Sequence, residues 1–309
     1  MNTGIIWPVF LRSMIMPDRM LIVGGTGLLG VDLTRFFSTS YKVCSVGHRE
    51  MDITNADQVM RFFDNLGPQY VLHAAAVADV DKCEIYKDIA MSVNADGTNN
   101  IVRACRECGA FLVYYSTDYV FDGLKGAPYI ESDRANPINF YGRTKLEGEL
   151  RVLNNADSAA VLRVAWLYGS SEKSFIYRLI QDSLRQVADK KAGLRGEEIK
   201  IVADQISTPT WTWDVARQTE AVLRGRLSGL FHCTAEGQAT RKETADYVLK
   251  KLGLDVDLAL FRKDEFDWLA PRPGNTALEN GRLKRYDINV MPDYRAGIDR
   301  YLEEWRNNH

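Results

Sequence analysis

The chain has 309 residues, 46% of them hydrophobic, with 39 basic and 41 acidic residues and a formal net charge of −2. This length and composition suit a folded protein with a sizeable core, built as one large domain or two smaller ones. The balanced charge offers no field that would attract nucleic acid or an anionic membrane, so neither is expected as a partner. Five scattered cysteines do not form a disulfide framework, which predicts a cytoplasmic location.

Residues 1–19 are expected to form a disordered extension or an overlong start, with Met16 or Met20 as possible true starts. Their apolar run at 5–11 contains a proline, is too short to cross a membrane, and has no basic residue before it. We therefore expect the first strand to begin at Met20.

Residues 20–30 read as a buried strand that turns on glycines into an amphipathic helix. The spacing Gly24-x-x-Gly27-x-x-Gly30 is typical of the first strand-to-helix turn of a dinucleotide-binding domain. One glycine allows the tight turn, Gly27 lets backbone N–H groups approach a pyrophosphate, and Gly30 lets the helix pack against the strand. The helix N-terminus, with Leu28 and Leu29, then faces the phosphates. An ordinary strand-to-helix loop is the alternative.

The second strand, expected at 41–47, bears on the choice of cofactor. An NAD enzyme usually has an acidic residue at the end of this strand to bind the ribose 2′-OH. Arg49 is found there instead, and its cation suits the 2′-phosphate of NADPH. Glu50 is close enough in sequence that NADH stays an alternative cofactor. For Arg49, the alternative is a solvated surface arginine without a role in binding.

Strands and helices alternate through the first half of the chain, with helices expected at 28–37, 56–66 and 82–108 and strands at 68–76 and 110–117. This order predicts an α/β fold of Rossmann type, with a doubly wound parallel sheet. Ala75 and Ala76 end the third strand, where small side chains let a flat cofactor lie on the strand ends. Asp52 and Ile53, just before a helix, are also assigned to the cofactor site.

Tyr141 and Lys145 lie four residues apart and share one face of a predicted helix. A phenol has a pKa near ~10, and a neighbouring ammonium should lower it and make the phenol a workable proton donor. The spacing alone is not specific, because Tyr247 and Lys251 repeat it on what reads as a surface helix.

The context of Tyr141 distinguishes it from Tyr247. Tyr141 follows a strand that ends in two hydroxyl residues, Ser116 and Thr117, in a chain that already has a dinucleotide turn. This combination predicts a catalytic site.

These motifs carry a family resemblance. The glycine turn, residues 74–76, 93–95 and 116–121, and the Tyr141–Lys145 pair together resemble an extended short-chain dehydrogenase/reductase. Within that superfamily the chain is most similar to the dTDP-4-dehydrorhamnose reductase family, through residues 162–169, 204–210, 272–278 and 291–295. The resemblance implies reduction, by NADPH or NADH, of the 4-keto group of a nucleotide-diphospho-6-deoxy sugar, most closely dTDP-4-dehydro-L-rhamnose.

The resemblance also implies roles for individual residues. Tyr141 would donate a proton, Lys145 would hold the nicotinamide ribose, and Thr117, with Ser116 behind it, would orient the carbonyl. Substrate contacts are expected from Asp118, Trp166 and Arg272, with a loop cap as the alternative for Asp118 and a core aromatic for Trp166. No metal site is predicted.

Three other activities of related proteins are weighed against this one. Sugar-nucleotide dehydratases typically have a glutamate after the Thr-Asp pair, where this chain has Tyr119. Epimerases use the same Thr/Tyr/Lys set with tightly bound NAD. The regulatory subunit of methionine adenosyltransferase has similar motifs and acts by binding a partner, so turnover does not follow from the motifs alone.

The second half predicts a smaller C-terminal substrate-binding lobe. We expect a Rossmann domain at 20–168 plus about 205–235, and the lobe at about 169–204 plus 236–309. A strand near 229–234 should return to the main sheet, and Thr240 and Glu243 form a capping box for a helix that ends near Leu252. A homodimer stays compatible with the sequence.

Overall fold

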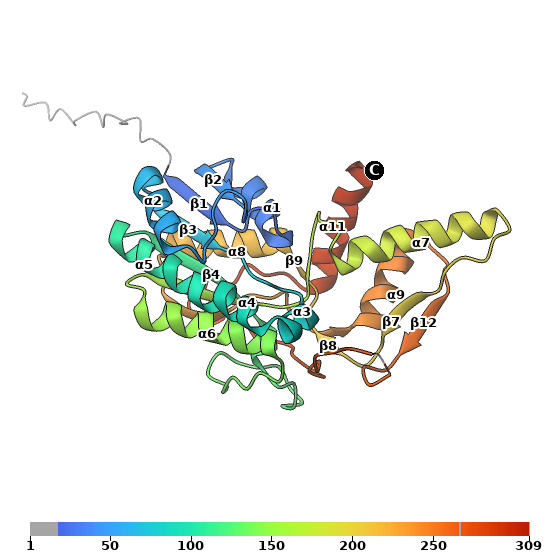
Figure 1. Cartoon of the computed structure of the whole chain (residues 1–309). Helices are drawn as coiled ribbons and strands as arrows, with labels where there is room; N and C mark the ends of the chain where they lie inside the picture. The colour runs from blue at the N-terminus through green and yellow to red at the C-terminus, as the bar shows by residue number, and fades with distance from the viewer. Residues whose placement is uncertain (1–17, 266, 309) are drawn as a thin grey trace, which may run out of the picture.

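A parallel six-stranded sheet organises the computed structural model, which describes residues 18–265 and 267–308 (Figure 1). The strand order is β2-β1-β3-β4-β5-β10, and all neighbours are parallel. The strands are β1 (Arg19–Val23), β2 (Lys42–Val46), β3 (Tyr70–His73), β4 (Phe111–Thr117), β5 (Ala159–Val164) and β10 (Gly229–His232). The order reverses between β1 and β3, where open sheets of this kind bind ligands.

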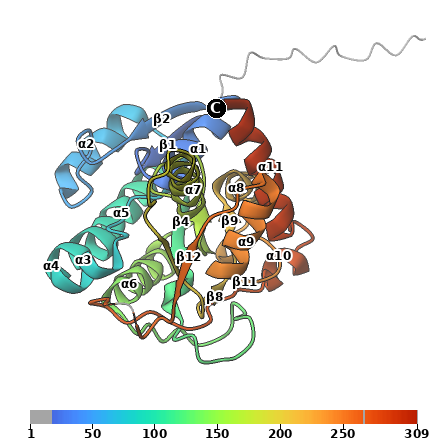
Figure 2. The same ribbon diagram turned by 90° about the vertical axis from the view of Figure 1, so that its right-hand side faces the viewer.

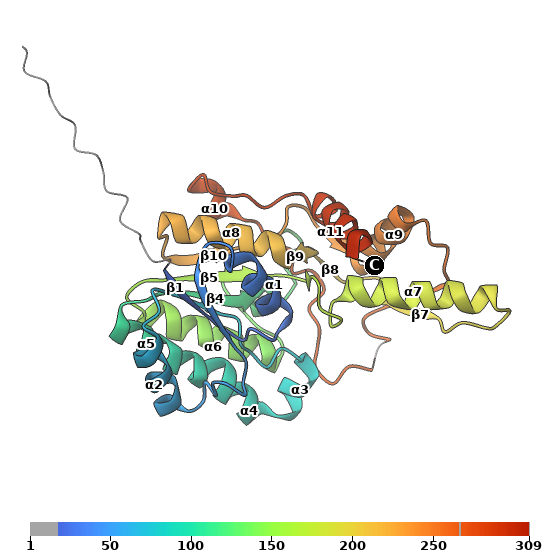
Figure 3. The ribbon, with the colours of Figure 1, turned by 90° about the horizontal axis from the view of Figure 1, so that it is seen from above.

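Helices cover both faces of this sheet (Figures 2 and 3). One face packs against α1 (Leu28–Phe37), α8 (Thr212–Gly225) and α10 (Gly281–Arg285), and the other against α2 (Ala56–Leu66), α5 (Thr98–Cys108) and α6 (Phe140–Asn155). Each interface is a separate apolar core. The predicted doubly wound α/β sheet is confirmed.

The start of the fold differs from the prediction. Asp18 accepts a hydrogen bond from the backbone N–H of Lys42 (3.0 Å), and Arg19 is the first residue of β1, paired with Lys42. The expected strand start at Met20 is therefore wrong by one residue, because pairing with β2 extends β1 back to Arg19. Residues 1–17 of the expected extension lie outside the described residues.

The single helix expected at 82–108 is also wrong. The chain forms α3 (Val80–Ile85), α4 (Lys87–Met91), a π-helical turn η1 (Ser92–Gly97) and then α5. Tyr86 leaves helical geometry (φ −111°, ψ 60°), which separates α3 from α4. Within η1, the buried Asn94 side chain bonds both backbone groups of Val77 (2.8 and 3.0 Å) and the Thr144 hydroxyl (2.9 Å). The π turn thus ties the loop after β3 to α6.

The remaining elements stand beside the carboxyl ends of the sheet strands (Figure 1). They are β6 (Leu167–Tyr168), α7 (Phe175–Lys191), β7 (Ile199–Val202), β8 (Ile206–Ser207), β9 (Thr210–Trp211), β11 (Ala239–Thr240), α9 (Arg241–Leu252), β12 (Leu258–Phe261) and α11 (Tyr294–Asn308). A third core joins α7, α9 and α11, and α9 begins with the predicted capping box. No helix in the described ranges is long and apolar enough to cross a membrane.

Helix α6 is held to the sheet by a buried ion pair. The Arg163 guanidinium on β5 donates two hydrogen bonds to Glu149, at 2.8 and 2.6 Å. The two side chains are only 4% and 1% exposed. Removing one partner would leave the other charge buried without compensation, which costs far more than losing a surface pair.

Glu149→Gln should therefore lower the free energy of unfolding by about 3–5 kcal/mol. Urea denaturation followed by circular dichroism measures this. Glu147→Gln, on the same helix and in none of the ion pairs formed by the described residues, is the matched control and should change little. Equal losses in both variants would contradict the structural importance of the Glu149–Arg163 pair.

Candidate active site

The glycine turn and the segment after β3 lie against each other where the strand order reverses. Gly24 has φ +88°, and a Cβ there would lie 2.5 Å from the Ala75 backbone nitrogen. A Cβ on Gly30 would lie 2.1 Å from the Gly24 carbonyl oxygen. Only glycine fits these two positions. The glycine turn can therefore pack directly against the segment after β3 and against the start of α1, as in a pyrophosphate-binding turn.

Other residues assigned to the cofactor lie at or near the glycine turn. Gly27 is the N-cap of α1 and offers no side chain to the free amides. Leu28 follows it, partly exposed, whereas the Leu29 side chain is buried in the core and leaves only its amide to face an anion. Asp52 accepts hydrogen bonds from the backbone (2.9 Å) and hydroxyl (2.8 Å) of Thr54, which lower its pKa.

Ile53 and the turn after β2 also belong to the predicted cofactor site. Ile53 is buried and would contact a Cβ on Gly97 at 2.7 Å. Gly24 donates a hydrogen bond to the Val46 carbonyl (2.9 Å), so the end of β2 lies beside the glycine turn. Arg49 is exposed in the turn that follows, and Glu50 accepts a hydrogen bond from the Gly47 amide (2.9 Å).

The predicted catalytic hydroxyls lie at the carboxyl end of β4. Thr117 is buried, donates a hydrogen bond to Asp118 (3.1 Å) and accepts one from the Tyr119 amide (3.2 Å). Ser116 is also buried, and its hydroxyl has no hydrogen-bond partner among the described residues. An unpaired buried hydroxyl is costly, so a group that bonds it would stabilise the site.

Helix α6 brings Tyr141 to this strand end. A Cβ on Gly142 would lie 2.1 Å from the Tyr119 carbonyl oxygen, so glycine allows α6 to start in contact with the 3₁₀ turn at Asp118–Val120 (η2). The rings of Tyr141 and Tyr119 meet edge to face with centroids 6.0 Å apart. Thr117 also acts on the Tyr141 phenol, where it lowers the pKa against the larger effect of burial. Thr117 and Tyr141 are thus brought together, whereas Ser116 precedes Thr117 in β4, and successive strand side chains point to opposite faces.

The expected effect of Lys145 on the Tyr141 pKa is wrong for this structure. Burial is the largest influence on the pKa of Tyr141 and raises it, and the Lys145 charge is not among the main influences. Lys145 instead donates a hydrogen bond to the Tyr115 carbonyl (2.8 Å) and lies 4.0 Å from the centre of the Tyr114 ring. Burial lowers the pKa of Lys145 to about 7. Position on the same helical face did not decide where the ammonium points.

Asp118 joins the sheet to the smaller part of the molecule. Besides the Thr117 bond, its buried carboxylate accepts hydrogen bonds from the Ser207 hydroxyl (3.0 Å) and the Thr276 hydroxyl. Burial raises the pKa of Asp118 to about 6, although these bonds oppose the shift. The carboxylate therefore holds protein hydroxyls in place.

The two other predicted substrate residues are also engaged. Trp166 has φ +38° and is partly exposed, with the Arg241 guanidinium 3.9 Å from its ring centre. Arg272 forms a two-pronged ion pair with Asp81 in α3, at 3.0 and 3.1 Å. This pair connects the loop after β3 to the segment before Thr276.

Two residues that bear on the site were missed as site residues. Asn94 was noted only as part of a motif, and its bonds to Val77 and Thr144 depend on the π turn. Arg241 lies between the two capping-box residues Thr240 and Glu243, and its aromatic neighbours come from distant parts of the chain. The pair Tyr247 and Lys251 bonds to Asp299 on α11.

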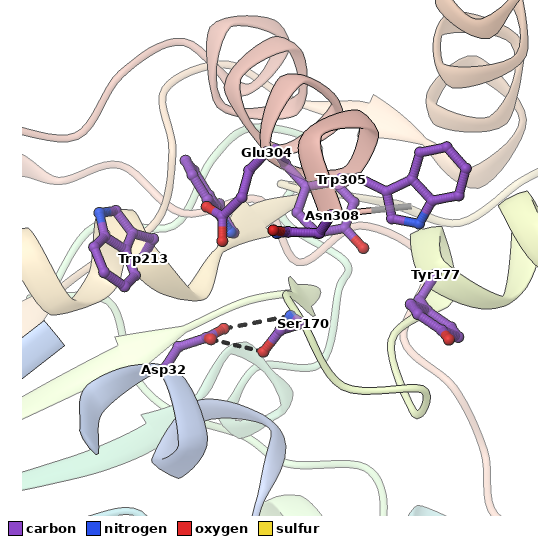
Figure 4. Close-up of a pocket in the computed structure, with 9 residues that line it drawn as sticks. Asp32, Ser170, Tyr177, Trp213, Glu304, Trp305 and Asn308 are labelled. Atoms are coloured by element: carbon purple, nitrogen blue, oxygen red, sulfur yellow. Dashed lines mark hydrogen bonds between the residues drawn. The ribbon is translucent and has the colours of Figure 1, made fainter. Parts of the chain in front are cut away.

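A separate hollow of about 60 Å³ lies between α1, α8 and α11 (Figure 4). Asp32, hydrogen-bonded to Ser170, lies on one side of it, and Glu304 and Trp305 lie on the other. None of the residues assigned to catalysis, cofactor or substrate lines it. It is therefore not part of the candidate active site.

Comparison with known proteins identifies the family. A family model described as RmlD substrate binding domain matches residues 18–307. The chain belongs to this family. Within it, the chain is similar to a dTDP-4-dehydrorhamnose reductase from Burkholderia thailandensis, with 31% identity over 91% of this chain and 96% of the relative.

Two further comparisons extend the RmlD likeness. A dTDP-4-keto-6-deoxy-D-glucose reductase from Streptomyces niveus is 36% identical over 78% of this chain and 81% of the relative. The crystal structure of a dTDP-4-dehydrorhamnose reductase from Bacillus anthracis in complex with NADP aligns with a TM-score of 0.88 at 30% identity. The alignment covers 94% of this chain and 100% of the Bacillus anthracis chain.

The raised pKa of Asp118 predicts a pH-dependent stability term. The unfolded chain ionises this carboxyl near 3.8 and the folded chain near 6, so its contribution to the unfolding free energy should fall by up to about 3 kcal/mol as pH rises across that window. The stability difference between wild type and Asp118→Asn, from urea denaturation at several pH values, measures this.

Asp122→Asn is the control of opposite sign, because hydrogen bonds from Tyr129 and Asn136 lower the pKa of Asp122. The stability that Asp122 contributes should be lost as pH falls. A wild-type-minus-Asp118→Asn difference that does not change between pH 4 and 6 would contradict the account of Asp118.

Proposed function

We propose that this chain reduces the 4-keto group of a nucleotide-diphospho-6-deoxy sugar with NADPH, most closely converting dTDP-4-dehydro-L-rhamnose to dTDP-L-rhamnose. The observation that carries the proposal is the position of Tyr141 beside Thr117 at the carboxyl end of β4, in the same sheet as the glycine turn after β1. Relatives at 31% and 36% identity are named as reductases of dTDP-keto sugars, which supports the same reaction class.

The glycine turn suits a dinucleotide. Gly24 and Gly30 let the turn pack closely against the end of β3 and the start of α1, where any side chain would collide with backbone, and no side chain caps the first amides of α1. Gly27, Arg49, Ala75 and Ala76 complete the set of residues that would hold NADPH, with NADH as the alternative. When bound, NADPH supplies the hydride that reduces C4.

Tyr141 would supply the proton in this reaction. Because burial raises its pKa, the phenol is protonated at neutral pH and starts as a donor. Its O–H bond breaks as the carbonyl oxygen takes the proton, and the carbonyl becomes a hydroxyl. Thr117 and Ser116 would hold that oxygen by hydrogen bonds.

Lys145 would hold the nicotinamide ribose. Its ammonium already lies at the end of β4, bonded to the Tyr115 carbonyl, and it has two further protons to donate. With a pKa of about 7, its charge changes near neutral pH and responds to what binds beside it.

The same proposal divides the chain between its ligands. Residues 20–168 with about 205–235 would bind the cofactor, and about 169–204 with 236–309 the sugar nucleotide. Trp166 would contact the sugar, and Asp118 would act on substrate through the Thr117 hydroxyl. Arg272 would reach substrate only after parting from Asp81. A cytoplasmic location and a homodimer stay predictions of the sequence.

Tyr141→Phe removes only the proton, so it should lower kcat by at least ~10²-fold while the Kd for NADPH stays unchanged. Loss of NADPH absorbance with dTDP-4-dehydro-L-rhamnose measures the rate. Tyr247→Phe, in the second Tyr-x-x-x-Lys pair, is the matched control and should keep wild-type turnover.

Two results would favour other functions. Interconversion of sugars without net NADPH oxidation would indicate an epimerase. A wild-type protein that binds NADPH and another protein tightly but turns over no 4-keto sugar nucleotide would indicate a regulatory subunit.

Arg49→Ala should weaken NADPH binding about tenfold and leave NADH binding unchanged, because only NADPH carries the 2′-phosphate. Titration of each cofactor by calorimetry measures both Kd values. Arg224→Ala, which removes an exposed arginine of α8, is the control for net charge. Equal weakening of both cofactors would show that Arg49 does not read the phosphate.

A further inference from the structure

Arg241, the first residue of α9, is clamped between two aromatic rings. Its guanidinium lies 3.9 Å from the ring centre of Trp166 and 4.7 Å from that of Phe175. No hydrogen bond or ion pair joins it to any residue of the described ranges. Five N–H donors in a fixed planar arrangement are therefore presented without an acceptor.

This is an unfavourable place for a cation on its own. Burial lowers the pKa of Arg241 to about 10, and the nearby charge of Arg178 adds to the shift. The positive end of the α9 dipole also disfavours a cation in the first turn. The contacts with the two aromatic rings offset only part of the cost of holding the Arg241 cation here. An anion bonded to Arg241 would offset all three effects.

Arg241 lies next to the candidate catalytic residues. Its charge acts on Tyr119 and Asp118, and the Tyr119 ring packs against Tyr141. Arg178 projects from α7 as an exposed side chain and forms no ion pair with the rest of the described chain. Two guanidiniums without carboxylate partners thus lie close to each other, with Arg241 near Tyr119, and their combined charge suits a diphosphate.

A groove continues from this clamp. It has a volume of about 620 Å³ and runs between α7 and β7, with Phe175, Arg178 and Trp268 among its lining residues. Phe175 is therefore shared by the Arg241 clamp and the groove wall. The volume is typical of a small-molecule site, and aromatic rings suit a nucleobase.

We propose that Arg241, clamped by Trp166 and Phe175, acts with Arg178 to bind the diphosphate of the sugar nucleotide, while its nucleoside lies in the groove between α7 and β7. The identity of the ligand rests on the proposed function. The assignment itself rests on the unpaired guanidiniums and their position between Tyr141 and the groove.

The test compares dTDP, thymidine and NADPH by calorimetry. Arg241→Met keeps the length of the side chain and removes the charge, so it should weaken dTDP binding about 10- to 100-fold. Thymidine has no phosphate, and its affinity should not change. The Kd for NADPH should also hold. Lys242→Met, which removes the adjacent, partly exposed lysine of α9, is the matched control and should leave all three affinities intact.

Steady-state kinetics give a second readout. Arg241→Met should raise the KM for the sugar nucleotide far more than it lowers kcat, and Arg241→Lys should recover part of the loss. Arg178→Met should weaken dTDP binding less than Arg241→Met, and because Arg178 is exposed, this variant keeps the proposal testable if Arg241→Met does not fold.

Three outcomes would overturn the assignment: unchanged dTDP affinity in Arg241→Met, an equal loss in Lys242→Met, or a loss of NADPH affinity in place of dTDP affinity. The proposed function fails separately. Wild-type protein that binds dTDP through Arg241 but reduces no 4-keto sugar would refute the reductase and retain the anion site. Wild-type turnover with an unchanged KM in Arg241→Met would refute the anion site and retain the reductase.

Discussion

The buried carboxylate of Asp118 is the interaction on which the active-site region depends. Asp118 lies directly after β4. Its carboxylate accepts hydrogen bonds from the hydroxyls of Thr117, Ser207 in β8 and Thr276. A carboxylate without a cation at this depth is tolerated only when its oxygens accept several hydrogen bonds. Satisfying Asp118 therefore holds the smaller part of the molecule against the sheet, and it orients the Thr117 hydroxyl.

Burial decides the chemistry around this point more than pairwise charge does. Tyr141 and Lys145 share a helical face, yet desolvation moves their pKa values toward the neutral forms, upward for the phenol and downward for the ammonium. Arg241 shows the same effect among aromatic rings. The site gathers polar groups whose bonding capacity is incompletely used, including the Ser116 hydroxyl. Such a site is prepared for a polar, anionic ligand.

Local patterns could be read from the sequence because their causes are local. The bounds of α1 and α2, the capping box at Thr240 and the glycine spacing all follow from periodicity, capping chemistry and the absence of a Cβ. The break at Tyr86 and the π turn around Asn94 could not be predicted from the sequence. The π turn positions the Asn94 side chain to bond Val77 and Thr144, which lie elsewhere in the chain.

The sequence by itself determined the fold class, the dinucleotide turn and the association of Tyr141 with the strand that ends in Ser116 and Thr117. Each of these can be predicted from residue types and their spacing along the chain. Only the tertiary structure decided where the charged groups point. Lys145 turns to a backbone carbonyl, Arg272 pairs with Asp81, and Arg241 is left unpaired between rings. Desolvation and partner choice depend on segments far apart in the chain, and spacing along the sequence carries no information about them.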